Sequence, residues 1–201
     1  MLKEIKIGKT LVSSKEDVLK LKGKIMKALK GVDRAEYLIV DISGVDFCIT
    51  RESLQLIQYV FDPERKKRVF LKGSQKNARE IEGVLNELQR GALWIDEQGT
   101  LTILGDMVKK NPYKRGCDYL SLLKFIYTER FVTSKDVVEK FNISQSLAFY
   151  KLNKLFIWTL VHREKTMVTS GGFTFIYYLP EFIGSNYRWG HWLTEKAVLE
   201  K

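Results

Sequence analysis

Residues 133–155, TSKDVVEKFNISQSLAFYKLNKL, decide the fold of the second part of this chain. Ser134 begins a stretch with apolar residues at helical spacing. Residues 142–144, Asn-Ile-Ser, have the composition of a tight turn, and Ser144 suits the first position of a further helix. The sequence therefore predicts two helices joined by a short turn. The expected inward residues are Val137, Val138 and Phe141 on the first helix, and Ala148, Leu152 and Leu155 on the second.

The flanking segments extend this pattern on both sides. Upstream, residues 119–127 have the spacing of another helix, and residues 131–132 that of a brief extended link. Downstream, residues 160–163 and 173–178 resemble strands, and the polar segment 164–172 between them ends in two glycines. The expected order is therefore helix, helix, turn, helix and β-hairpin, an α+β arrangement.

This order resembles that of prokaryotic winged-helix transcription regulators, over residues 117–180, and residues 133–155 resemble their helix-turn-helix. The resemblance implies that the third helix enters the major groove of double-stranded DNA and that the hairpin, or wing, lies near a phosphate or the minor groove. The chain departs from the family at residues 156–158, Phe-Ile-Trp, where a polar turn with glycine is usual. We expect this corner to be buried against a partner or the other domain.

The resemblance makes outward side chains of the third helix and wing candidate DNA contacts. Gln145 suits a bidentate pair with adenine, and Phe149 suits a thymine methyl group. The helix candidates are Ser144, Gln145, Ser146, Phe149, Tyr150, Lys151 and Lys154, with both lysines expected at phosphates. The wing candidates are His162, Arg163 and Lys165. For any single one of them, a solvated or packing role is as simple an explanation.

Residues 1–105 alternate strand-like runs with amphipathic segments. Strands are expected at 2–7, 37–40 and 68–71, and a hairpin at 92–95 and 100–104. Helices are expected after a capping box at 13–16, at about 50–61, and from Ser74 to near Gly91. The inward residues of the first and third helices are Val18, Leu21, Ile25 and Leu29, and Ala78, Ile81, Leu85 and Leu88. Parallel strands need connections long enough for a helix, so this alternation predicts an α/β sheet with packed helices.

Residues 38–50, LIVDISGVDFCIT, resemble the strand, turn and helix entry of STAS and STAS-like domains, the fold of anti-sigma factor antagonists. The similarity spans roughly residues 1–105 and implies a protein-interaction or dimerisation domain. Phosphorylated members carry Ser or Thr at this helix start, which makes Thr50, followed by Ser53, the candidate phosphorylation site. Residues 49–52 replace the usual Asp-Ser-Ser-Gly of the family, and a role as helix N-cap is the simpler explanation of Thr50.

Residues 106–116 are polar and basic and contain Pro112 and Gly116, so we expect a linker between the two domains. Residues 181–201 form an aromatic and basic extension. A terminal helix at 193–199 that docks on these aromatics, or pairs two subunits, is a simpler expectation than stacking on exposed bases.

Composition indicates a folded cytoplasmic protein. The chain has 201 residues, of which 45% are apolar and 29% charged, and a net charge of +10. No apolar run approaches the roughly 20 residues of a transmembrane helix, and the first residues do not resemble a signal peptide. Residues 1–105 contribute +4 and residues 106–201 contribute +6. This surplus suits a polyanionic partner or an ordinary solvated surface.

Catalytic and metal-binding patterns do not stand out. Cys48 and Cys117 are too few for a disulfide framework or a thiolate metal site. His162 and His191 have no companion at ligand or triad spacing. Residues 72–74, Lys-Gly-Ser, lie at a strand-to-helix junction without a glycine-rich phosphate loop. We therefore expect no cofactor, no metal and no enzymatic activity.

The leading hypothesis is a homodimeric DNA-binding protein in transcription regulation, with a STAS-like domain for dimerisation or partner binding and a winged helix for duplex DNA. The alternative is a protein-interaction adaptor that uses both domains without DNA, motivated by the apolar corner at 156–158. An enzyme acting on nucleotides or nucleic acids is a third, weaker hypothesis, because no carboxylate cluster has convincing spacing.

Overall fold

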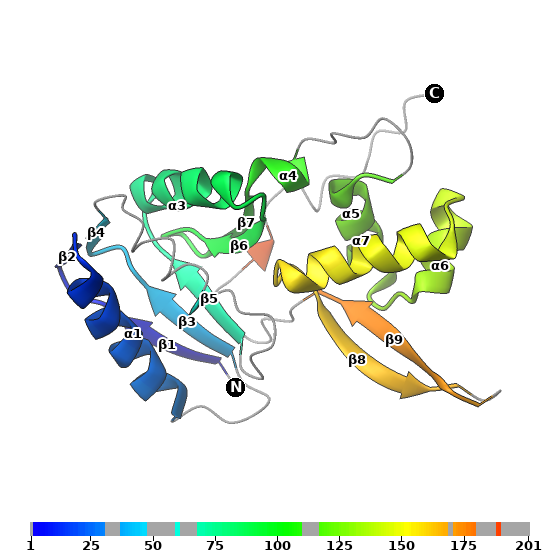
Figure 1. The fold of residues 1–201 in the computed structure, drawn as a ribbon, viewed down its shortest axis with the longest axis horizontal. Helices are drawn as coiled ribbons and strands as arrows, with labels where there is room; N and C mark the ends of the chain where they lie inside the picture. Colours follow the sequence, from blue (N-terminus) through cyan, green and yellow to red (C-terminus); the bar gives the residue numbers. More distant parts are fainter. Residues whose placement is uncertain are drawn as a thin grey trace.

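A computed structural model describes residues 2–30, 37–47, 59–60, 68–109, 117–168, 171–179 and 188–189. The chain is a mixed α/β protein (Figure 1). The elements of residues 1–105, the first half, are β1 (Leu2–Lys6), β2 (Thr10–Val12), α1 (Lys15–Lys30), β3 (Tyr37–Asp41), β4 (Val45–Phe47), β5 (Arg68–Lys72), α3 (Gln75–Glu87), β6 (Ala92–Ile95) and β7 (Thr100–Leu104). Those of the second half are α4 (Asp106–Lys109), α5 (Tyr119–Glu129), α6 (Ser134–Phe141), α7 (Gln145–Ile157), β8 (His162–Met167), β9 (Phe173–Tyr178) and β10 (Arg188–Trp189).

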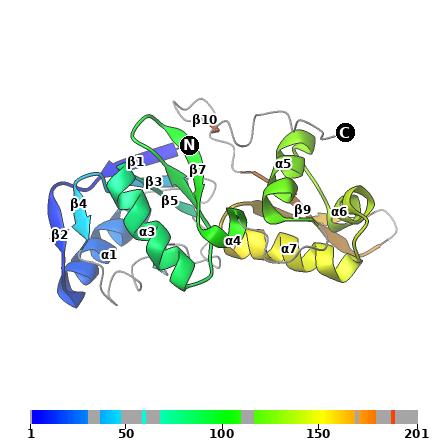
Figure 2. The same ribbon diagram turned by 90° about the horizontal axis from the view of Figure 1, so that it is seen from above.

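The main sheet has the strand order β1-β3-β5-β6-β7-β10, and all its neighbouring strands are parallel except β6 and β7. Strands β1, β3, β5 and β6 are neighbours in the order in which they occur along the chain. Right-handed crossovers between strands in this order place their helices on the same face of the sheet. Helices α1 and α3 indeed lie on one side of it (Figure 2).

This first face carries most of the core of the first half. The expected α1 residues Val18, Leu21, Ile25 and Leu29 are buried, as are Ile81 and Leu85 of α3. They pack with alternate residues of the strands, among them Leu38, Val40, Val69, Leu71 and Trp94. The predicted α/β arrangement is therefore confirmed for the first half.

The second face of the sheet is also apolar and buried. Its residues are Ile39, Phe70, Leu93, Ile95, Leu101 and Ile103. They belong to a continuous apolar cluster that includes Val108 of α4 and the interior of the second half. Burial on both faces explains why these strands are hydrophobic almost throughout.

The described residues of the segment 117–179 form three helices and a hairpin in the predicted order. Asp118, Thr133 and Ser144 cap α5, α6 and α7, and each accepts a hydrogen bond from a backbone amide of the first turn. The turn before α7 contains Asn142 in the left-handed conformation, with φ of 49°. The expected inward residues of α7, Ala148, Leu152 and Leu155, are fully buried. Strands β8 and β9 pair antiparallel, from His162↔Tyr178 to Met167↔Phe173.

The two halves touch at the ends of α4 and α7. Gly91 lies so close to Val108 that a side chain at position 91 would overlap it, and Leu160 lies beside the same position. The Arg90 guanidinium donates a hydrogen bond of 3.2 Å from Nη2 to the carbonyl of Ile157. Trp158 is buried. Phe156 and Ile157 are half-buried, and the Trp158 ring packs on Tyr119 of α5. Of the expected burial of the 156–158 corner, the structure therefore shows a buried Trp158 and one hydrogen bond from the first half to Ile157.

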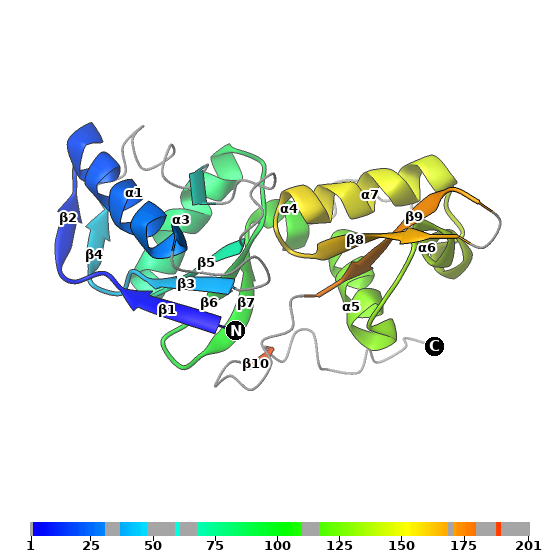
Figure 3. The same ribbon diagram turned by 90° about the horizontal axis from the view of Figure 1, so that it is seen from below.

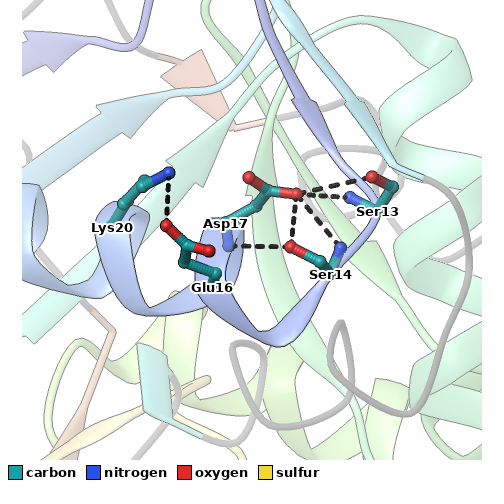
Figure 4. Close-up of polar contacts among 5 residues, drawn as sticks. All are labelled: Ser13, Ser14, Glu16, Asp17 and Lys20. Carbon is teal, nitrogen blue, oxygen red and sulfur yellow. Dashed lines mark hydrogen bonds and ion pairs between the residues drawn. The ribbon is translucent and has the colours of Figure 1, made fainter.

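The start of α1 differs from the prediction by one residue (Figure 4). Asp17 Oδ2 accepts hydrogen bonds from the backbone and hydroxyl of Ser14, at 3.1 and 2.8 Å, and Ser14 Oγ accepts one from Asp17 N at 3.2 Å. Glu16 instead pairs with Lys20 at 2.9 Å. The capping box is therefore residues 14–17, because Asp17 is the carboxylate that reaches the free amides.

Three further boundaries were predicted wrongly. Helix α3 ends at Glu87, and Gln89, with φ of 50°, takes the left-handed position expected of Gly91. Strand β8 continues to Met167, because residues 164–167 pair with β9 instead of forming a loop. Strands β2 and β4, which pair with each other, were missed, since three residues are too short for a readable period.

Several predicted segments lie wholly or partly outside the described residues. Tyr59 and Val60 are helical, whereas Thr50, Ser53 and the rest of the helix expected at 50–61 are not described. Of the expected linker, residues 106–109 form α4, and 110–116 are outside the description. Of the carboxyl-terminal extension, residues 188–189 are described, and these form β10, which adds to β7 of the first-half sheet. None of the described helices is long and apolar enough to cross a membrane.

Candidate nucleic-acid interface

The first two turns of α7 present their outward side to solvent. Ser144 Oγ accepts a hydrogen bond of 3.3 Å from Leu147 N, so Ser144 acts as the cap of this helix. Because Ala148 and Leu152 face inward, the helical period places the candidates Ser146, Phe149 and Tyr150 outward, and Gln145 is exposed because it is the first residue of the helix. All four are exposed, with Phe149 at 46% and Tyr150 at 54%. This outward surface of hydrogen-bonding and aromatic groups is called the α7 face below.

Gln145 connects α6 to α7. Its Nε2 donates a hydrogen bond of 2.7 Å to Ser134 Oγ. A side-chain amide nitrogen carries two hydrogens, so this bond engages one of them. Pairing with an adenine edge needs one amide hydrogen and the amide oxygen. The bond to Ser134 therefore holds the side chain in place and is compatible with such a pair.

The two lysines of α7 lie in different environments. Lys151 is only 5% exposed, and its Nζ is 4.7 Å from the centroid of the Tyr119 ring. It therefore lies inside the second half, which corrects the expectation that it reaches a phosphate. Lys154 is half-buried, with its Nζ 5.6 Å from the Tyr150 ring at the edge of the α7 face. The helical spacing carries this difference, because Lys151 lies three residues after Ala148 and four before Leu155, whereas Lys154 has no such spacing to the buried stripe.

Arg163 fastens the hairpin to α7. Its guanidinium carbon is 4.0 Å from the Phe156 ring and 4.6 Å from the Phe175 ring, and Nη1 donates a hydrogen bond of 2.9 Å to Asn153 Oδ1. A guanidinium enclosed between two rings contributes packing and cation–π attraction. Arg163, expected at a phosphate, is thus a structural contact between β8 and α7.

The other two wing candidates lie on opposite faces of the hairpin. Lys165 is exposed, and its Nζ is 3.8 Å from the Phe173 ring. His162 stacks on Tyr178 at 5.5 Å between ring centroids, and the Tyr178 hydroxyl donates a hydrogen bond to Glu164. Alternation along β8 puts Lys165 on the face of Arg163, and His162 on the reverse.

The structure adds an apolar group that the sequence interpretation missed. Met167, Val168 and Phe173, called the apolar tip below, are exposed at the end of the hairpin. The sequence predicts Met167 and Val168 in the polar segment 164–172 and Phe173 in a strand. No local sequence signal shows this group, because it depends on the cross-strand pairing of Met167 with Phe173, which places both side chains on one face.

Groups suited to catalysis are buried or scattered. Burial raises the pKa of the Cys117 thiol to about 12, which suppresses the nucleophilic thiolate. Within the described ranges, no cluster of three or more His, Cys, Asp or Glu residues has a geometry that could hold a metal ion. Burial also raises the pKa of Glu80, on the first-half helix α3.

Searches of protein-family models, curated protein sequences and solved structures find no significant match to this chain.

Proposed function

We propose that this protein is a DNA-binding transcription regulator, in which the second half is a winged helix and α7 is its recognition helix. The α7 face is the observation that carries the proposal. It combines an amide, a hydroxyl and two aromatic rings within two helical turns, and these groups match base edges and the thymine methyl. Positive charge of +6 on residues 106–201 supplies attraction to phosphates.

In the proposed complex, the side chains of the second half have different tasks. The bases in the major groove are approached by Gln145, Ser146, Phe149 and Tyr150. Ser144 caps the start of α7, where the free amides of the helix face the DNA backbone. Lys154 and Lys165 contact phosphates. Lys151, Arg163 and His162 support the fold of the domain.

The first half is proposed to be a STAS-like domain for dimerisation or partner binding. Its alternating α/β sheet with α1 and α3 on one face supports this assignment. The contacts of Arg90 and Gly91 with the end of α7 join the two parts, so a dimer formed through the first half would set the spacing of two recognition helices. Analytical ultracentrifugation tests the dimer, and a monomer at micromolar concentrations contradicts it.

Fluorescence anisotropy with a labelled duplex pool of about 30 base pairs tests DNA binding across a salt series. Each phosphate contact contributes about 0.9 to the slope of log affinity against log salt. We expect Lys154→Ala to reduce the slope by about this amount. Lys20→Ala removes the same charge from α1 and is the matched control, expected to leave the slope unchanged. Lys151→Met is also expected to leave it unchanged, because this lysine is buried.

Recognition of the bases is tested separately from binding to the DNA backbone. After selection of a preferred duplex from a random pool, Gln145→Ala is expected to relax specificity at one position by about 1–3 kcal/mol. Failure of the full chain to bind any duplex at low salt overturns the proposal. The adaptor alternative was motivated by the apolar 156–158 corner, of which the Ile157 carbonyl accepts a hydrogen bond from Arg90 of the same chain. The adaptor alternative is supported if the chain binds no duplex but retains a protein partner from nuclease-treated lysate.

A further inference from the structure

The end of the β8–β9 hairpin carries apolar side chains where solvent reaches them. Met167 is 77% exposed, Phe173 52% and Val168 37%. Met167 and Phe173 form the last cross-strand pair, so their side chains lie together on one face. Isolated exposed apolar residues are ordinary, but three at the end of a projecting hairpin form a compact wedge.

The backbone holds this tip in a defined turn. Val168 N donates a hydrogen bond of 3.2 Å to the Gly172 carbonyl, and Gly171 N donates one of 2.9 Å to the Val168 carbonyl. Gly171 and Gly172 have φ of 88° and 91°, a conformation that side chains strongly disfavour. Behind the tip, Arg163 fixes the base of the hairpin to α7 through Asn153 and two rings. The wedge is therefore mounted on a supported strand pair.

The charge next to the tip suits a polyanion. Lys165 lies directly over the Phe173 ring, on the same face as Met167. From Lys165 to Leu179 the sequence contains no Asp or Glu. Glu164, the residue before Lys165 in β8, lies on the opposite face of the hairpin, where it accepts a hydrogen bond from Tyr178. An apolar wedge with a cation on its own face matches a groove between phosphate chains, in which apolar atoms meet the bases and the ammonium meets the DNA backbone.

The tip also lies in a suitable place relative to the α7 face. The amino-terminal end of α7 and the hairpin end both lie on the side of the second half away from the first-half sheet (Figures 1 and 3). A six-residue strand extends about 20 Å, which carries the tip well away from the carboxyl-terminal end of α7, after which β8 begins. One duplex that receives α7 in its major groove can therefore present its neighbouring minor groove to the hairpin.

We propose that the apolar tip, Met167, Val168 and Phe173, inserts into the DNA minor groove as a wedge between base pairs and bends the duplex. This inference rests on the proposed function and adds to it indirect readout, in which DNA sequence is recognised through how easily the duplex deforms. Apolar side chains that part a base step kink DNA by about 20–90°, and TA steps unstack most easily. The wedge therefore favours sites with a flexible step under the hairpin, at a position where α7 makes no contact.

The test is a duplex of about 30 base pairs with a fluorescence-transfer pair at its ends and a central TA step, compared with one that has a stiff central A-tract. Binding is followed by anisotropy and bending by energy transfer. We expect the full chain to bend the TA duplex and to bind it more tightly than the A-tract duplex. Met167→Gln combined with Phe173→Gln is expected to abolish bending and weaken TA binding about tenfold. Met26→Gln, an exposed methionine of α1, is the matched control.

The outcomes separate the wedge from DNA binding itself. If the chain binds both duplexes without a change in energy transfer, or if the double variant bends the TA duplex as well as the wild type, the wedge is wrong and the proposed function stands. If no duplex is bound, the proposed function fails and the wedge fails with it. A third arm uses vesicles of phosphatidylglycerol and phosphatidylcholine. The inference is overturned if the wild type binds the vesicles, the double variant does not, and both bend the TA duplex equally. This result would assign the tip to a membrane surface.

Discussion

Gly91 lies where the first half packs closely against Val108 and Leu160 of the second half. A β-carbon at this position would overlap Cγ2 of Val108 and lie 3.4 Å from the Leu104 carbonyl oxygen and 3.5 Å from Cδ1 of Leu160. Val108 is buried and β-branched, so its methyl group cannot rotate away without strain. The substitution Gly91→Ala is therefore expected to destabilise the protein.

The expected cost is that of placing an extra methyl group in a packed core, about 1–3 kcal/mol in the free energy of unfolding. With a urea m-value of about 2 kcal/mol/M, the midpoint of unfolding falls by about 0.5–1.5 M. Gly83→Ala is the matched control, because Gly83 lies within α3 and its added methyl group meets no atom within 4 Å. The control is expected to stabilise the protein by about 0.5–1 kcal/mol through helix propensity.

Urea titrations followed by far-ultraviolet circular dichroism and by tryptophan fluorescence measure the effect. Val108→Ala removes the overlapping methyl group, so Gly91→Ala should cost less in the Val108→Ala background, with a coupling energy of about 1–2 kcal/mol. The two probes should report one transition, since one apolar cluster spans both halves. The reasoning is refuted if Gly91→Ala leaves the free energy of unfolding unchanged, or if the costs of Gly91→Ala and Val108→Ala simply add. Two separate unfolding transitions would also refute it.

Three further predictions concern single contacts. Hydrogen bonds lower the pKa of Asp17, the largest effect coming from Ser14 and the next from Ser13. Ionised Asp17 therefore stabilises the fold at pH values above its ordinary pKa, and this stabilisation is lost as the pH falls through the lowered pKa. In an NMR titration, Ser14→Ala should raise the pKa of Asp17 toward the ordinary value, and an unchanged pKa contradicts the capping geometry. In a Cys48→Ser background, the Cys117 thiol should react with iodoacetamide at pH 8 only on unfolding, because burial raises its pKa to about 12. Rapid labelling of the folded chain would contradict the burial of this thiol. Arg163→Ala should lower the free energy of unfolding by about 1–3 kcal/mol, because the guanidinium loses two ring contacts and a hydrogen bond; thermal unfolding with no loss contradicts its structural role.

Local signals predicted the helices well where a polar cap and an apolar stripe coincide. Ser74 before α3 and Ser144 before α7 set helix starts through bonds within three residues, which a sequence displays directly. At α1 the same signal was read one residue early, since Ser13 and Ser14 are adjacent and two acidic residues follow them. Boundaries failed where the partner is distant, as at residues 164–167, whose strand conformation depends on pairing with β9.

For the candidate interface, the sequence predicted the α7 face but not the roles of the charges around it. The buried stripe of Ala148, Leu152 and Leu155 fixes which side of the helix faces solvent. Whether a lysine at the border of that stripe reaches water depends on the neighbouring element. Tyr119 of α5 covers Lys151, and the environment of Arg163 is created by Phe156 and Phe175 from two different elements.

By itself, the sequence determined the order of the main elements, the caps and the inward faces, because these follow from hydrogen bonds and periodicities within a few residues. Only the tertiary structure decided that both faces of the first-half sheet are buried, that Arg90 contacts the end of α7 while Gly91 lies beside Val108 and Leu160, and that β10 joins β7. Each of these depends on contacts between residues far apart in the chain, for which a local pattern carries no signal. The exposed apolar tip belongs to the same group, since the pairing of Met167 with Phe173 brings it together.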